Sequence, residues 1–224
     1  MLKPVIIVAN DIPDAWHQLI LAAPGHARLF TIDRGSYKGQ KRLEFDSIYV
    51  QIKYPGTRPF EPELPLSMKG VPNPVAEGYI EAYLPYLMTS TTSTQEQYTY
   101  GIYLEPQIQY VIDTYKKYSY RNNQLYMTVG DSKDITMTDP PCLRGIDCRI
   151  QDDKLHFHVY FRSHDLWSGF PANLGALEYL KEYMASEIGV DTGETIEISK
   201  GGHYYGYIVD LVCQRCRVDN NYEC

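Results

Sequence analysis

Residues 155–161 alternate between apolar and polar side chains, a period of two that predicts a strand with one buried face. Leucine, methionine and isoleucine recur at helical spacing from Ala172 to Ile188, which predicts a helix, and Gly189 is a typical C-terminal stop. Other apolar runs predict strands at Val5–Val8, Leu43–Ile52, Thr195–Ser199 and His203–Val212, and helices at Asp14–Ala23 and Leu104–Tyr118.

Two stretches lack such a period. The segment from Tyr54 to Pro74 is rich in proline and glycine, which predicts an irregular loop, and Thr89 to Gln97 is a polar connection. Neither stretch separates two plausible cores, so we expect a single domain spanning residues 1–224. Helices mixed with strands, several of them late in the chain, predict an α+β fold with a mixed or antiparallel sheet covered by helices.

The charge balance bears on the partners of the chain. The net charge is -7 and the pI about 5.4, whereas a nucleic-acid scaffold normally carries a basic excess, so we expect no nucleic-acid partner. The apolar runs are far shorter than the roughly 20 residues of a membrane span, so we expect no membrane association. The N-terminal residues do not resemble a signal peptide and the cysteines number five, an odd count, which together favour a cytoplasmic location.

The first chemically informative motif lies at residues 139–142. Pro140 and Pro141 restrict the backbone directly before Cys142, which reduces the freedom of the thiol. One interpretation is a catalytic nucleophile. The other is a small buried apolar residue, the commoner role of a lone cysteine.

The segment that follows supplies polar groups suited to a phosphate and a base. Arg162 and Ser163 end the predicted strand and combine fork donors with a hydroxyl, as an anion site requires. Such a cation would also favour a thiolate if it lay near the cysteine. Asn173 opens a helix, where it is either an N-terminal cap or an amide that reads the N3–H and O4 edge of uracil. His203 and Tyr205 point to one face of a strand, as ligands or as ordinary surface polarity.

Four motifs then occur in order along the chain. They are Pro-Pro-Cys ending at Cys142, Arg-Ser-x-Asp after the predicted strand, Gly-x-Pro-x-Asn ending at Asn173, and His-x-Tyr beginning at His203. In their order and separations they resemble the thymidylate synthase family, specifically its short archaeal-type members. The similarity is clearest from Arg121 to Asp210 and extends more weakly back to Asp33.

The resemblance implies a role for each matching residue. Cys142 is implied to be the nucleophile that adds to C6 of a pyrimidine, and Arg162 to bind the phosphate and support the thiolate. Upstream, residues 33–36 are similar to the phosphate-gripping loop of the family, and residues 98–101 to the motif whose tyrosine orders active-site water. The implied catalytic residues are Cys142, Arg162, Asp165 and Tyr100, and the implied substrate ligands are Arg34, Ser163, Asn173, His203 and Tyr205.

The reaction implied by the resemblance converts dUMP to dTMP. The one-carbon donor is a reduced pterin, either 5,10-methylene-tetrahydrofolate or a methylene-tetrahydromethanopterin, and no metal is expected. The family also implies a thymidylate-synthase-like fold in which one sheet face forms the interface of a homodimer. Two alternatives stay open: a dUMP or dCMP hydroxymethylase of the same family, and a nucleotide-binding homologue without catalysis. Asn173 favours uracil, because cytosine recognition would favour an aspartate at that position.

The chain departs from the family pattern in four places. Leu143 stands where the family usually has a histidine, and the arginine pair donated by a partner subunit is reduced to Arg121, displaced in register. The catalytic glutamate matches Glu81 by spacing, with Glu77 on nearly the same side one turn earlier, although either could lie on a solvated helix face. The chain also stops soon after the His-x-Tyr strand, so we expect a differently built cofactor pocket.

The C-terminal segment holds Cys213, Cys216 and Cys224. Such a group could bind zinc or an iron–sulfur cluster or act in redox chemistry, but four convincing ligands are lacking, and incidental cysteines are the commoner case. His156 and His158 alternate on a predicted strand as metal ligands can. Since no carboxylate pattern accompanies them, we interpret them as structural or site-lining.

Overall fold

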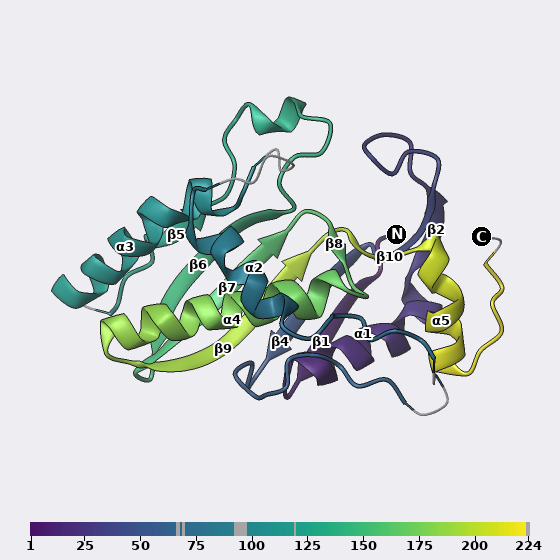
Figure 1. Ribbon diagram of the computed structural model, residues 1–224, viewed down its shortest axis with the longest axis horizontal. Coiled ribbons are helices and arrows are strands. Elements are labelled where there is room, and N and C mark those ends of the chain that lie inside the picture. The colour runs from purple at the N-terminus through teal and green to yellow at the C-terminus, as the bar shows by residue number, and fades with distance from the viewer. Residues whose placement is uncertain (66–67, 69, 92–97, 119, 223–224) are drawn as a thin grey trace.

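The structure is a computed structural model that describes residues 1–65, 68, 70–91, 98–118 and 120–222. Its described strands form two sheets, around which the helices pack (Figure 1). The strands are β1 Pro4–Ala9, β2 Arg28–Thr31, β3 Lys41–Glu44, β4 Ser47–Ile52, β5 Tyr126–Thr128, β6 Leu143–Gln151, β7 Lys154–Phe161, β8 His164–Asp165, β9 Asp191–Ser199 and β10 Gly202–Tyr205. The helices are α1 Ile12–His26, α2 Tyr79–Met88, α3 Gly101–Lys117, α4 Gly169–Ile188 and α5 Gly206–Cys216, with a 3₁₀ turn, η2, at Asp134–Thr136.

The larger sheet has six strands in the order β1-β4-β9-β7-β6-β5. Strand β7 pairs in parallel with β9 and antiparallel with β6, so the sheet is mixed. The predicted alternation of β7 is confirmed: Leu155, Phe157, Val159 and Phe161 are buried, and the residues between them are half-exposed. These pairings, together with the helices, confirm the α+β prediction.

Helices cover one face of this sheet. Helix α4 lies along the middle of the face with α2 packed on it, and α1 and α3 lie to either side (Figure 1). Helix α4 begins three residues before the predicted Ala172 and ends at Ile188, where Gly189 adopts the left-handed conformation at φ 88° that glycine tolerates best. The predicted helices at Asp14–Ala23 and Leu104–Tyr118 correspond to the longer α1 and α3.

The opposite face of the larger sheet exposes apolar side chains. Strand pairing places Ile6 beside Tyr49, Tyr49 beside Ile198 and Ile198 beside Tyr160, so these residues form one row across four strands. Ile6 is 72% exposed, and Val8, one position further along the same face of β1, is 48% exposed. Apolar rows of this kind are typical of surfaces that another protein surface covers.

The smaller sheet has the strand order β2-β3-β10-β8, and it corrects one prediction. The expected strand at Leu43–Ile52 is two strands, β3 and β4, which belong to different sheets. The chain changes sheets at Phe45 and Asp46: the Phe45 amide donates to the Gly202 carbonyl, and the Asp46 carboxylate accepts from Lys3 and Arg28. The apolar pattern continues through the bend because Phe45 is itself buried.

A second correction concerns the expected strand at His203–Val212. It ends at Tyr205, and α5 begins at the next residue. The buried residues of the helix are Val209, Val212 and Cys213, which follow the helical spacing of three and four rather than the period of a strand.

Helix α2 corrects a third expectation. It begins at Tyr79 after Gly78, which has φ 75°, so Glu77 precedes the helix and does not share a helical face with Glu81. The segment 54–74 is irregular where described, as expected, and the predicted connection at 89–97 lies outside the described residues from residue 92 onward. Among the described helices, none has the length and apolar character needed to cross a membrane.

Candidate functional site

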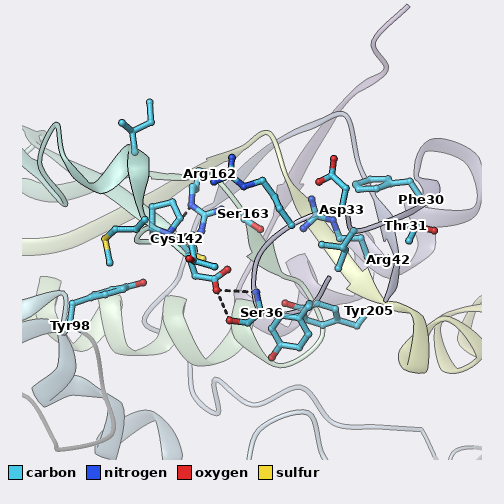
Figure 2. Close-up of a pocket in the computed structure, with 18 residues that line it drawn as sticks. Phe30, Thr31, Asp33, Ser36, Arg42, Tyr98, Cys142, Arg162, Ser163 and Tyr205 are labelled. Carbon is cyan, nitrogen blue, oxygen red and sulfur yellow. Dashed lines mark hydrogen bonds between the residues drawn. The ribbon is translucent and has the colours of Figure 1, made fainter. Parts of the chain in front are cut away.

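A pocket of about 590 Å³ opens between the smaller sheet and the loop that carries Cys142. Figure 2 shows Cys142, Arg162 and Ser163 on one side of it and Phe30, Arg42 and Tyr205 on the other. Arg34 also lines the pocket. The structure therefore brings together five of the residues chosen from the sequence, namely Cys142, Arg162, Ser163, Arg34 and Tyr205.

Arg162 holds the backbone of the cysteine loop. Its Nε donates to the carbonyls of Pro140 and Pro141 at 3.1 and 3.2 Å, and its Nη2 donates to the Pro140 carbonyl at 2.5 Å. The Arg162 amide donates to the Cys142 carbonyl at 2.9 Å. Proline has no backbone N–H to donate, so neither proline can hold the loop by an amide hydrogen bond. The Arg162 guanidinium holds the loop instead, through the two proline carbonyls.

The groups around Cys142 shift the pKa of its thiol in opposite directions. Burial raises the pKa of the thiol, and the nearby Asp139 raises it further, whereas Arg162 and Arg42 lower it. The net shift is upward, so in the free protein the thiol keeps its proton at neutral pH. A change in the solvation of the pocket would alter this balance, because burial is the largest cause of the shift.

The loop at residues 33–36 is fastened to the cysteine loop. The amide of Ser36 donates to the Asp139 carboxylate at 3.0 Å, and the Ser36 hydroxyl donates to the same oxygen (Figure 2). Gly35 has φ 89°, and a Cβ there would lie 2.7 Å from the Asp139 carboxylate. Glycine alone has both a low-energy conformation at this φ and no Cβ to meet the carboxylate. Another residue at position 35 would therefore strain the backbone that places Arg34 at the pocket.

Arg42 lies in the pocket although the sequence interpretation did not include it. Its Nη2 is 2.7 Å from Glu44, its guanidinium lies over the Phe30 ring at 4.8 Å, and its Nε is buried without a hydrogen-bond partner among the described residues. The sequence of residues 41–44 could have indicated this position of Arg42. Leu43 is buried on one face of the strand, so its neighbours Arg42 and Glu44 must point to the other face.

Tyr100 is buried beneath the cysteine loop. Its hydroxyl oxygen accepts from the Leu143 amide at 3.3 Å, which connects the residue after the nucleophile to the start of α3. Burial, together with the nearby Cys142 and other tyrosines, raises its pKa well above the ordinary value. Gly101 follows because a Cβ there would meet the Thr89 backbone at 1.9 Å.

His203 and Tyr205 share one face of β10, as predicted from their spacing. The Nδ1 of His203 is 2.8 Å from the Gly201 carbonyl, and its buried Nε2 has no partner among the described residues. Burial lowers the pKa of His203 to about 4, so the ring is neutral at physiological pH. The Tyr205 ring stacks on Tyr37 at 4.6 Å and contacts His203 edge-on at 4.7 Å.

Asp165 and Asn173 line a second pocket of about 380 Å³ at the start of α4. The Asp165 carboxylate accepts from the amides of Trp167, Ser168 and Gly169 and so caps this end of the helix. Burial raises the pKa of Tyr205, and Asp165 and Cys142 both add to the shift. Asp165 and Asn173 line a different pocket from Cys142.

Four of the predicted residues line neither pocket. Tyr100 and His203 are buried, as described above, whereas Arg121 and Glu81 are exposed elsewhere. Arg121 lies with Arg149 at the far end of β6 from Cys142. Six residue steps along the strand separate Arg149 from Leu143, a length of roughly 20 Å. Glu81 is exposed on α2 and accepts a hydrogen bond from the Tyr179 hydroxyl at 2.7 Å.

The C-terminal cysteines are separate from these pockets. Cys213 is buried on α5, and the Cys216 thiol donates to the Ile20 carbonyl at 3.2 Å, so both pack toward α1. Cys224 lies outside the described residues. Among the described residues, Cys142, Cys148, Cys213 and Cys216 form no disulfide with one another.

Comparisons with known proteins show to which family the chain belongs. The family model described as "Thymidylate synthase" matches residues 94–221. The chain is 31% identical over 215 residues to a protein of Methanosarcina mazei named "Putative thymidylate synthase", with 92% of each chain covered, and 30% identical over 213 residues to one of the same name from Methanococcoides burtonii, again with 92% of each covered. It is also 30% identical over 92 residues to the "Thymidylate synthase" of Listeria monocytogenes, which covers 41% of this chain and 29% of that protein. The chain belongs to the thymidylate synthase family.

Proposed function

We propose that the protein methylates C5 of dUMP to form dTMP, with Cys142 as the nucleophile and a reduced pterin as the source of the one-carbon unit. The observation that carries the proposal is the pocket in which Cys142 meets Arg34, Arg42 and Arg162. In a chain of net charge -7, three arginines on one pocket favour an anionic ligand. Family membership supports a pyrimidine nucleotide as that ligand.

The phosphate of dUMP binds between the two sides of this pocket. Arg162 uses Nε and Nη2 on the proline carbonyls and keeps Nη1 for the ligand. Arg42, which lines the pocket, contributes its guanidinium, and Ser163 a hydroxyl. Charge-assisted hydrogen bonds of this kind are about twice as strong as neutral ones.

Cys142 adds to C6 of the pyrimidine as its thiolate. Burial raises the pKa of the thiol, so Arg162 and Arg42 are needed to bring the anion within reach at neutral pH. Addition at C6 makes C5 nucleophilic, and C5 then forms the new carbon–carbon bond. The Tyr100 hydroxyl fixes the amide after the nucleophile and so limits movement of the thiol.

The base and the sugar are held by groups on α4 and β10. The carboxamide of Asn173 reads the uracil edge. Tyr205, which lines the first pocket, offers its hydroxyl to the 3'-hydroxyl of deoxyribose, with the neutral His203 in edge contact with its ring as the second member of the pair. Phosphate, base and sugar contacts together hold the pyrimidine over the thiol.

The second pocket suits a planar reduced pterin. Its volume lies in the range of small-molecule sites, and its walls include the buried Val75, the exposed Tyr79 and the carboxylate of Asp165, which retains acceptor capacity toward a ring N–H. When bound, the pterin supplies the one-carbon unit and the hydride. Tetrahydrofolate and tetrahydromethanopterin forms both present such a ring.

We also infer that the protein acts as a homodimer. The row formed by Ile6, Tyr49, Ile198 and Tyr160 offers an apolar face for a second copy of the chain. Arg121 lies too far along β6 to reach the pocket of its own chain. A role for Arg121 in phosphate binding therefore requires that it reach the pocket of the partner.

Covalent trapping with 5-fluoro-dUMP tests the proposal. Fluorine at C5 cannot leave as a proton does, so we expect a stable adduct that mass spectrometry of the denatured protein detects and peptide mapping assigns to Cys142. Parallel incubations with methylene-tetrahydrofolate and methylene-tetrahydromethanopterin identify the pterin. Cys148→Ala is the matched control, because Cys148 is a free but fully buried thiol. An unmodified protein with both pterins, or an adduct on another cysteine, would refute the assignment.

A further inference from the structure

Two buried side chains, His164 and Glu197, form a hydrogen-bonded chain with the half-buried Asn173 near the start of α4. The Nδ1 of His164 is 2.7 Å from Oε1 of Glu197, and its Nε2 is 3.0 Å from Oδ1 of Asn173. Residue exposures are 3% for His164 and 0% for Glu197. The three residues come from β8, β9 and α4, so the arrangement is built by the tertiary fold and not by local sequence.

The hydrogen-bond partners of His164 determine which of its ring nitrogens carry a proton. A carboxylate only accepts, so Nδ1 of His164 carries a proton and donates to Glu197. Nε2 then either donates to the Asn173 oxygen as part of a cation or accepts from the Asn173 amino group as part of a neutral ring. The protonation of His164 therefore decides which end of the carboxamide it holds.

The charged groups around His164 favour the cation. Burial lowers its pKa, but the charge and hydrogen bond of Glu197 on β9 outweigh burial, and Asp165 on β8 and Asn173 on α4 add to the rise, so the net shift is upward. His203 on β10, the other titratable ring nearby, is neutral because burial lowers its pKa to about 4. The remaining neighbours, Phe161 stacked at 3.9 Å and Phe170 at 5.7 Å, are apolar.

A protonated His164 fixes the outward edge of Asn173. With Oδ1 bonded to Nε2–H, the amino group is the end of the carboxamide left for the base that Asn173 is proposed to read. An amino group donates to O4 of uracil. At the same position cytosine carries its own amino group, and two donors that face each other are both left unpaired.

We propose that Glu197 and His164 are positioning residues that orient the carboxamide of Asn173 and thereby make the site selective for uracil over cytosine. The inference rests on the proposed function, since it assumes that Asn173 reads the base. It explains why a carboxylate and an imidazole occupy the core between β9 and α4, where apolar side chains would pack at no electrostatic cost.

Nucleotide selectivity measured against pH tests the inference. Isothermal titration calorimetry gives the dissociation constants of dUMP and dCMP, and their ratio cancels the ionisation of the phosphate. In Glu197→Gln the amide cannot hold His164 as a cation, so Asn173 turns and presents its oxygen. We expect the preference for dUMP at pH 7.5 to fall about tenfold. We also expect the pH at which the preference is lost to move to lower values than in the unmodified protein.

The matched control is Glu178→Gln. Glu178 is also a buried carboxylate, 2.7 Å from the buried Lys181 on the same helix, but it makes no contact with the Asn173 network. Its variant should bind both nucleotides with the ratio and pH profile of the unmodified protein. A general loss of packing would weaken both nucleotides equally and leave the ratio unchanged.

The outcomes separate the inference from the proposed function. If the unmodified protein prefers dUMP and Glu197→Gln gives the same ratio and profile, the inference is wrong while the proposed function stands. If the unmodified protein shows no preference for dUMP, the proposed function fails as well. Should Glu197→Gln not fold, the double variant Glu197→Met with His164→Phe replaces the whole pair by apolar groups, a change that buried pairs often tolerate. That variant is expected to lose the same selectivity, and retention of the preference would overturn the inference.

Discussion

Arg162 and His164 lie two residues apart at the end of β7, yet their surroundings differ completely. Arg162 is half-exposed, bonds to backbone carbonyls and lines an open pocket together with two other arginines. His164 is buried, stacks on Phe161 and has its carboxylate partner within the core. The open pocket is a set of cations arranged for a ligand, whereas the buried cluster is complete without one.

The difference shows how one short segment serves two tasks. Charges in the open pocket remain hydrated until an anion arrives, so the protein loses little stability by keeping them there. A buried charge requires a built-in partner, and removing that partner is costly. Substitutions in the pocket should therefore affect function far more than stability, and substitutions in the buried cluster should affect both.

The largest expected effect is on the nucleophile. Cys142→Ser should lower the rate of dTMP formation more than about a thousandfold, because a serine hydroxyl is not activated by the cations that support a thiolate. Release of tritium from C5-labelled dUMP measures the rate. Cys148→Ala should retain activity, and a Cys142→Ser variant as active as the unmodified protein would exclude nucleophilic catalysis by this residue.

The next largest effect concerns stability in the buried cluster. Glu197→Ala leaves His164 without its partner and should reduce the free energy of unfolding by about 3–5 kcal/mol. Arg162→Met, at the edge of the pocket, should cost at most about 1–2 kcal/mol, since its bonds go to neutral carbonyls. Urea unfolding followed by circular dichroism compares the two, and equal losses would erase the distinction between the regions.

The stability conferred by the buried pair should also depend on pH. The pKa of His164 is raised in the folded state, mainly because the charge of Glu197 outweighs burial. The contribution of the pair is therefore complete below the ordinary histidine pKa of about 6.5 and is lost as the pH rises through the folded value. Urea midpoints of the unmodified protein and Glu197→Gln should accordingly converge as the pH rises, and a constant difference would contradict this.

A smaller effect is expected for Arg42, the pocket residue that the sequence interpretation missed. Arg42→Met should raise the KM for dUMP about tenfold to hundredfold, the range expected from losing a charge-assisted hydrogen bond. It should lower kcat by a smaller factor, because Arg42 lowers the pKa of Cys142 less than Arg162 does. Arg28→Met is the control, because Arg28 forms an ion pair with Asp46, in the bend between β3 and β4, and lies outside the pocket. Equal KM values for both variants would remove Arg42 from the phosphate site.

The smallest effect is on the reactivity of the free thiol. Burial raises the pKa of Cys142 and Arg162 opposes the shift, so Arg162→Met should raise the pKa further. Alkylation by iodoacetamide at pH 8 should then slow by a few-fold, and its midpoint should move to higher pH. An unchanged pH midpoint of alkylation would show that the Arg162 guanidinium holds the cysteine loop but does not lower the pKa of the thiol.

Much of the fold could be predicted because the relevant signals are local. The alternation of β7 and the spacing of α4 depend on neighbouring residues, and both elements were found where expected. The bend at Phe45 could not be predicted, because a buried phenylalanine continues the apolar pattern across the change of sheet. The helix after Tyr205 was missed because tyrosine and valine favour strands, whereas tertiary packing of Val209 and Val212 favours a helix.

The site divides in the same way. Cys142, Arg162 and Ser163 were identified from motifs, and the structure gathers them with Arg34 and Tyr205 in one pocket. The buried pair of His164 and Glu197 left no such signal. His164 and Glu197 are thirty-three positions apart along the chain, and each alone looks like an ordinary polar residue of a strand.

The most direct measurement is the mass of the nucleotide product. Purified protein, dUMP and the methylene form of each reduced pterin are incubated together, and the nucleotides are separated and weighed by mass spectrometry. The proposed function predicts a product heavier than dUMP by one methylene unit, formed by the unmodified protein and not by Cys142→Ser. A product with one further oxygen would identify a hydroxymethylase. Unchanged dUMP with both pterins would contradict the proposed catalytic function.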